Sequence, residues 1–143
     1  MVDKTLILRK FANLDEYVGQ IGEYSAISLE DYAQDWKIQR IVDRTLQMMI
    51  ETCLDVAGHI ISDEGFRVPE TYADMFKILV ENQILEKSQS EPLNRMTKFR
   101  NIVVHQYEKV DPTIVIGILR NNLEDFEKYK KAIIDYLTMS EGP

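Results

Sequence analysis

Apolar residues recur every three or four positions along one long segment, from Trp36 to Ile61. That spacing places them on one face of an α-helix. The apolar arc is wide, so other elements must cover this helix, and we expect it to be the centre of the core. Its apolar positions are Ile38, Ile41, Val42, Leu46, Met49, Ile50, Cys53, Leu54, Val56, Ala57, Ile60 and Ile61.

The rest of the chain also shows helical spacing, interrupted by residues that cap or end helices. Ser28 and Thr71 are predicted N-caps, and Pro92 is predicted at the first position of a helix. The segment that starts at Ser28 is expected to break near Asp35 and to resume, and Gly65 is expected to close the long helix. The other predicted helices run from about residue 3 to 24, 71 to 82, 92 to 105 and 112 to 137.

We find no alternation typical of strands, no internal repeat and no low-complexity segment. The 143 residues, 45% of them hydrophobic, are enough for one core. The sequence therefore predicts an all-α protein with a single domain over residues 1–143. Five helices with short connections predict an antiparallel bundle of four to five helices.

Composition restricts the classes of protein that remain. The single cysteine, Cys53, cannot form an internal disulfide and has apolar neighbours, which favours a reducing compartment. No stretch approaches the roughly 20 apolar residues that cross a bilayer. The first ten residues mix acids and bases, unlike a signal peptide. We expect a cytoplasmic protein that does not contact membranes.

The formal net charge is −7, which is unusual for a protein with a general nucleic-acid-binding surface. One short segment is basic, in contrast to the negative charge of the whole chain. It contains Arg95, Lys98, Arg100 and Lys109 and only one acid, Glu108. Arg95, Lys98 and Lys109 are therefore candidates for RNA binding. The alternative is an ordinary solvated helix face.

Of the two histidines, His105 lies in the more suggestive surroundings. His59 is on the apolar central helix, where a structural role is expected. His105 follows Arg100 by five residues and precedes Tyr107 by two, and Asn101 adjoins the arginine. Arginine binds phosphate through two parallel hydrogen bonds, and histidine exchanges protons near neutral pH. These residue types can cleave a phosphodiester, the histidine moving a proton and the arginine stabilising developing charge.

Two further points bear on this candidate site. Positions five apart on an ideal helix point about 140° apart, so Arg100 and His105 do not share a face well within one helix. No cluster with the usual spacing of metal ligands and no glycine-rich phosphate loop is present. We therefore expect no bound metal and no cofactor.

At this motif the chain resembles a known family. Arg100-Asn101-Ile-Val-Val-His105-Gln-Tyr107 is similar to the Arg-x4-His-x-Tyr signature of the HepT-like toxins in the HEPN superfamily. The central helix from Asp43 to Ile61 also resembles the second helix of that family, and length and helix order agree over nearly the whole chain.

The resemblance implies a homodimeric HEPN-type bundle in which the arginine and histidine of both subunits meet in a cleft. It implies a metal-independent endoribonuclease, the toxin of a type VII-like toxin–antitoxin system, with Arg100 and His105 as catalytic residues. The implied partner is an MntA-type nucleotidyltransferase antitoxin that transfers AMP to Tyr107. The added phosphate would pair with the arginine and occupy the place of the substrate phosphate.

Glu51 and Asp55 share a stripe of the central helix with Arg44 and Met48. Either carboxylate could orient Arg100 or His105, or could simply belong to a solvated face or pair with Arg44. Asn101 could orient either group or bind substrate.

Two other functions remain open from the sequence. The chain could be a non-catalytic binding module that presents a substrate to a nucleotidyltransferase, or a helical scaffold in which the motif occurs by chance.

Overall fold

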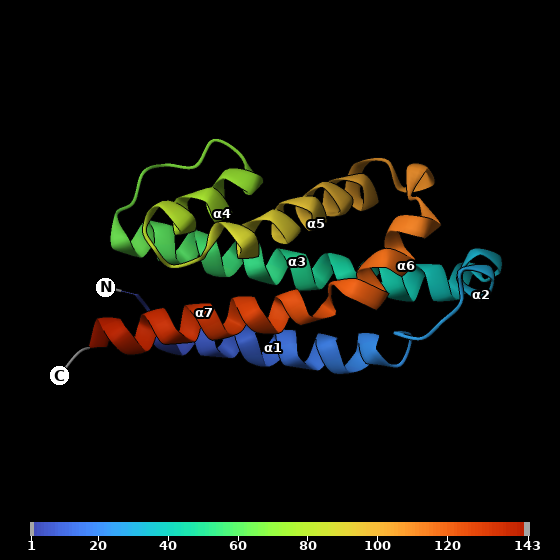
Figure 1. Cartoon of the computed structure of the whole chain (residues 1–143), viewed down its shortest axis with the longest axis horizontal. Coiled ribbons are helices and arrows are strands. Elements are labelled where there is room, and N and C mark those ends of the chain that lie inside the picture. Colours follow the sequence, from blue (N-terminus) through green and yellow to red (C-terminus); the bar gives the residue numbers. More distant parts are fainter. Residues whose placement is uncertain (1, 142–143) are drawn as a thin grey trace.

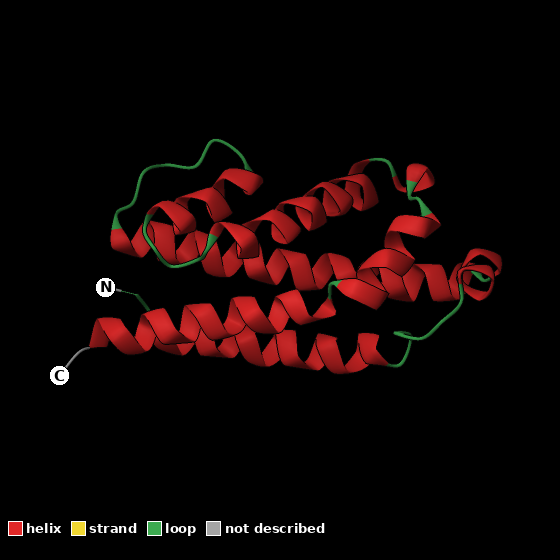
Figure 2. Ribbon diagram, viewed as in Figure 1, coloured by secondary structure: helices red, strands yellow, loops and turns green. Residues whose placement is uncertain are grey.

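A computed structural model describes residues 2–141, and every element in that part of the chain is helical (Figure 2). The prediction of an all-α protein is confirmed. No helix within these residues is long and apolar enough to span a membrane. The helices are α1 (Lys4–Gly22), α2 (Leu29–Gln34), α3 (Trp36–Glu64), α4 (Tyr72–Glu81), α5 (Lys87–His105), the 3-10 turn η1 (Tyr107–Lys109), α6 (Pro112–Asn121) and α7 (Leu123–Glu141).

The four longest helices form an antiparallel bundle with α3 at its centre (Figure 1). α1 and α7 lie side by side below α3 in that view, and α5 crosses above it. α4 packs on α3 and α5, while α2 and α6 meet at the far end of the bundle. α5 runs opposite to α3, so the end of α5 lies over the first half of α3. The predicted bundle of four to five helices is confirmed.

Tyr129 of α7 joins four helices in the core. Its ring meets Phe11 and Phe76 edge to face, with centroids 6.4 Å and 5.8 Å apart. Its hydroxyl donates to the Cys53 carbonyl at 2.8 Å. Cys53 is fully buried in α3, as its neighbours predicted. The central helix is thus held by packing and by a buried hydrogen bond to α7.

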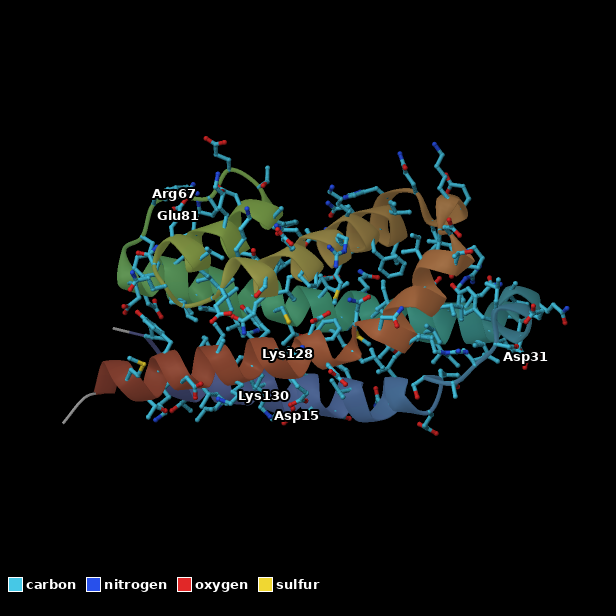
Figure 3. The ribbon with its side chains drawn as sticks, in the orientation of Figure 1. Asp15, Asp31, Arg67, Glu81, Lys128 and Lys130 are labelled. Carbon is cyan, nitrogen blue, oxygen red and sulfur yellow. The ribbon has the colours of Figure 1, made fainter. Side chains whose placement is uncertain are left out.

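Several hydrogen bonds and ion pairs stabilise the connection between α3 and α4, which also forms one wall of the candidate site described below. Gly65 has φ 68 and ends α3, and the Thr71 hydroxyl accepts from the Asp74 amide at 3.1 Å, as predicted. Arg67 in the connection pairs with Asp74 at 2.8 Å and with Glu81 at 2.9 Å. Figure 3 shows Arg67 and Glu81 close together above the bundle.

The surface pair of Lys130 and Asp15, also labelled in Figure 3, joins α7 to α1 at 2.7 Å. The predicted Ser28 cap is confirmed as well, since its hydroxyl accepts from the Asp31 amide at 3.0 Å. The expected break at Asp35 separates α2 from α3.

Two predicted boundaries are wrong. Pro92 is not at the start of its helix but inside α5, which begins at Lys87. The Glu86 amide donates to the Gln89 side chain at 2.8 Å, and this cap starts the helix earlier. The predicted last helix is also two helices, α6 and α7, which separate at Asn122. The Asn122 side chain donates to the Asp125 carboxylate in the first turn of the second helix.

Candidate functional site

The candidate site is built at the end of α5, where the backbone leaves the helix directly after His105. Gln106 has φ −144, and its amide donates back to the Ile102 carbonyl at 2.8 Å. The turn η1 follows, and then the Asp111 carboxylate accepts from the Thr113 amide at 2.9 Å and caps α6. The segment that carries Tyr107 is therefore held between two helix ends.

Arg100 is held by contacts from three helices, and its side chain is only 14% exposed. Nη1 donates to Asn101 Oδ1 at 3.1 Å, and Nε lies 3.8 Å from Glu51 Oε1 of α3. The guanidinium stands 5.2 Å from the centre of the Tyr72 ring of α4. Only Nη1 makes a hydrogen bond, since Nε is buried without a hydrogen-bond partner within the described residues. Nη2 enters neither contact, and we expect it to donate to a phosphate oxygen.

His105 is exposed and lines the same groove as Arg100 and Asn101. Within residues 2–141, no hydrogen bond or ion pair holds its ring. We call this the α4–α5 groove; it has a volume of about 710 Å³. Its lining residues are Pro69, Glu70, Thr71, Tyr72, Ala73, Met75, Thr97, Lys98, Arg100, Asn101 and His105. The groove holds a fixed cation and a free imidazole.

The two candidate supporting carboxylates have different surroundings. Glu51 lies beside Arg100 and also accepts from the Gln47 side chain at 2.6 Å. Asp55, one turn later, instead pairs with Lys10 of α1 at 3.4 Å. Of the two candidate carboxylates, Glu51 is therefore in place beside Arg100, whereas Asp55 pairs with α1 instead.

Tyr107 does not line the α4–α5 groove. It lines a separate cavity of about 170 Å³ together with Tyr32 and Asp43. Its hydroxyl is buried and makes no hydrogen bond of good geometry within the described residues. The motif is thus divided between two sites. Arg100, Asn101 and His105 line the α4–α5 groove, whereas Tyr107 lines the separate small cavity.

Asp43 is the residue that sequence analysis missed. It is 1% exposed, and its carboxylate accepts from the Tyr32 hydroxyl at 2.6 Å. Burial raises the pKa of Asp43 above its ordinary value, and the hydroxyls of Tyr32 and Tyr107 oppose part of that rise. Burial, and next the Asp43 charge, raise the pKa of Tyr107. The phenol of Tyr107 therefore stays protonated at neutral pH.

A cation completes this second cluster. The Arg40 guanidinium lies 5.3 Å from the Tyr107 ring centre and 5.6 Å from that of Trp36. The signal for Asp43 was present in the sequence, because an acid occupies the core stripe of α3 between Val42 and Leu46. A lone carboxylate in an apolar stripe requires a polar partner, which the fold supplies as Tyr32.

The raised pKa of Asp43 predicts a pH-dependent effect on stability. Between the ordinary aspartate pKa of about 3.9 and the raised value, the folded state binds more protons than the unfolded state. The free energy of unfolding therefore decreases as pH rises through that window. We expect the stability of the wild type relative to Asp43→Asn to fall from about pH 4 upward, measured by urea unfolding at several pH values. A relative stability that rises with pH would contradict the assignment.

The three candidate RNA-binding cations are all exposed. Arg95, Lys98 and Lys109 line a third groove, between α5 and α6, and Lys98 also lines the α4–α5 groove. His59 is half-buried on α3 and lies outside every one of these grooves. Within residues 2–141, no group of three or more His, Cys, Asp or Glu side chains could hold a metal ion.

The chain is similar to known proteins over most of its length. Residues 14–133 match the family described as Ribonuclease HepT-like. The chain is 30% identical over 124 residues to the mRNA nuclease HepT of Shewanella oneidensis, covering 87% of this chain and 92% of that protein. It is 26% identical over 140 residues to the tRNA nuclease HepT of Aphanizomenon flos-aquae, covering 98% and 95%.

Solved structures show the same fold. One is described as a toxin–antitoxin with AMP-PNP, with a TM-score of 0.87, 29% identity, and coverage of 92% of this chain and 99% of that one. Another, the tri-AMPylated Shewanella oneidensis HEPN toxin in complex with MNT antitoxin, has a TM-score of 0.84 and 30% identity, and covers 94% and 99%. The prediction of an endoribonuclease is confirmed at the level of the family. The chain belongs to the HepT-like ribonuclease family of HEPN proteins.

Proposed function

We propose that this chain is the toxin of a toxin–antitoxin pair, a cytoplasmic endoribonuclease that cleaves RNA without a metal ion. The observation that carries the proposal is the α4–α5 groove, where Arg100 is fixed by three helices and His105 is free. The names of the relatives, mRNA nuclease and tRNA nuclease, support RNA as the substrate class.

The groove residues divide the chemistry between them. The His105 imidazole takes the proton of a ribose 2′-hydroxyl as its oxygen bonds to the adjacent phosphorus. The bond from phosphorus to the 5′-oxygen then breaks, and that oxygen takes a proton from a second imidazolium. Arg100 donates to the phosphoryl oxygens, where negative charge builds up. Asn101 and Glu51 hold the guanidinium, and Glu51 reduces its cost of burial.

A second copy of the chain supplies the second histidine. Trp36 is 61% exposed on the first turn of α3, and Ile41 and Val104 are also exposed apolar residues. They lie at the same end of the molecule, because α5 ends over the first half of α3 (Figure 1). Apolar side chains gathered beside a site are typical of a protein–protein interface.

The dimer can be tested with one substitution on this face. Ile41→Glu, which leaves every groove residue intact, is expected to weaken the dimer about 30-fold or more, since it buries an unpaired charge in the interface. Light scattering at graded concentrations measures the change, and RNA cleavage should fall with the dimer. Leu8→Glu on α1, at a position with similar exposure, is the matched control. A monomeric wild type with full activity would contradict the shared site.

The antitoxin is an MNT-type nucleotidyltransferase that inactivates the chain by transferring AMP to Tyr107. A related toxin has been seen in its AMPylated form together with its MNT antitoxin, which supports this assignment. The Tyr107 oxygen bonds to the α-phosphorus of ATP and pyrophosphate leaves. Because the Tyr107 hydroxyl is buried, η1 must first turn outward.

The direct test is cleavage of single-stranded RNA by the purified, unmodified chain in the presence of EDTA. We expect cleavage, with products that carry cyclic phosphate and 5′-hydroxyl ends. The second candidate, a non-catalytic module that binds the nucleotidyltransferase, is favoured only by the net charge of −7. It predicts a stable complex with no mass change and no cleavage of RNA.

A further inference from the structure

A second groove lies on the other side of α5, between α5 and α6. This α5–α6 groove has a volume of about 510 Å³, within the range of sites that bind small molecules or single nucleotides. α5 and α6 are joined by the short η1 segment, and Lys109 at its end lines the groove. The groove is therefore built by the same segment that carries His105 and Tyr107.

The floor of the α5–α6 groove is apolar. Met96 and Phe99 of α5 and Ile118 of α6 are buried in the core and close the groove from below. Ile114 stands on the α6 side and is 52% exposed, although it is a large aliphatic residue. An exposed aliphatic side chain above a buried apolar floor offers contact to a flat apolar ligand such as a nucleobase.

The rim of this groove is basic. Arg95, Lys98 and Lys109 line it, and none of them enters an ion pair within residues 2–141. Asp111 is the one carboxylate in the lining, and it is already engaged by the Thr113 amide at the start of α6. Three unpaired cations on a chain of net charge −7 favour a polyanion as the ligand.

Lys98 connects the two grooves, since it lines both the α4–α5 groove and the α5–α6 groove. A strand whose scissile phosphate meets Arg100 and His105 can thus continue over Lys98 into the second groove. An apolar floor with a basic rim fits single-stranded RNA, whose bases are free to unstack while phosphates follow the cations.

We propose that the α5–α6 groove is an RNA subsite that holds a nucleotide flanking the cleaved bond, with its base on the apolar floor. The neighbouring phosphates lie against Lys98, Arg95 and Lys109. This subsite rests on the proposed ribonuclease function, and it explains how an acidic protein retains RNA.

The test compares a long and a short substrate. Ile114→Glu and the double variant Arg95→Glu/Lys109→Glu are expected to raise KM about tenfold for a single-stranded oligonucleotide of about 12 residues. The effect on a dinucleotide, which reaches only the α4–α5 groove, should be much smaller. For the double variant, the salt dependence of binding should fall by about 0.7 per lost phosphate contact. Leu8→Glu, exposed on α1, is the charge-matched control for Ile114→Glu. The double variant Arg9→Glu/Lys128→Glu, at exposed positions of α1 and α7, is the charge-matched control for the double groove variant.

Binding is also measured by fluorescence anisotropy in the His105→Ala background, so that it does not depend on cleavage. Loss of oligonucleotide binding in the groove variants supports the subsite even if no cleavage is ever observed, which would refute only the ribonuclease function. Wild-type binding in both groove variants overturns the subsite while leaving that function intact. The subsite is also overturned if these variants bind RNA normally but no longer bind the nucleotidyltransferase, because the groove would then be a protein-docking surface.

Discussion

Replacing His105 with alanine is expected to lower the rate of RNA cleavage about a thousandfold, the usual effect of losing a positioned acid or base. The imidazole is exposed and makes no hydrogen bond or ion pair within residues 2–141, so its removal leaves the bundle intact. The measurement is single-turnover cleavage of a labelled oligonucleotide. Melting temperature should stay within a few degrees of the wild type, which separates loss of chemistry from loss of fold.

The chain offers its own control for this experiment, because it has one other histidine. His59 of α3 lies outside the α4–α5 groove, so the His59→Ala variant should cleave RNA at nearly the wild-type rate. Arg100→Lys keeps the charge but loses the planar fork, so we expect about a hundredfold loss. Equal rates for His105→Ala and the wild type would place the active site elsewhere.

The elements of the bundle were predictable because their signals are local. Four predictions that depend only on neighbouring residues are confirmed. They are the apolar stripe of α3, the N-caps Ser28 and Thr71, and the end of α3 at Gly65. Pro92 was misplaced because two local signals compete there. A proline at the start of a helix is a strong preference, but a Glu86–Gln89 cap one turn earlier outweighs it.

The candidate site was only partly predictable, because it depends on where the backbone bends and on which helices meet. Arg-x4-His-x-Tyr suggests one cluster, yet the bend at Gln106 sends Tyr107 away from His105. Glu51 and Asp55 lie one turn apart on α3, and only packing decides that one meets Arg100 and the other meets Lys10. Tyr72 comes from another helix, and no spacing within α5 could indicate it.

Replacing Tyr107 with phenylalanine is expected to abolish the addition of AMP when the chain is incubated with ATP and the proposed MNT-type nucleotidyltransferase. Phenylalanine keeps the ring against Arg40 and loses only the hydroxyl proposed to accept AMP. Intact-mass analysis should show AMP-sized additions on the wild type and on the control Tyr17→Phe. Tyr107→Phe should show none.

The burial of Tyr107 also predicts what the modification does to the structure. A cavity of about 170 Å³ is smaller than the roughly 300 Å³ or more that small-molecule sites occupy, so it cannot retain an adenylated phenol. After modification, η1 must stay turned outward. The Lys109 and Val110 amides, which donate to Gln106 and Tyr107 in the unmodified turn, should then exchange hydrogen faster.

The same movement predicts how modification would stop cleavage. Once η1 turns outward, the new phosphate can reach Arg100 Nη2, the position proposed for the substrate phosphate. Modified wild-type chain should therefore lose both RNA cleavage and RNA binding, whereas Tyr107→Phe should remain active in the presence of the nucleotidyltransferase and ATP. If the modified chain still binds RNA with wild-type affinity, the adenylate does not occupy the α4–α5 groove, and inhibition must act on the chemical step instead.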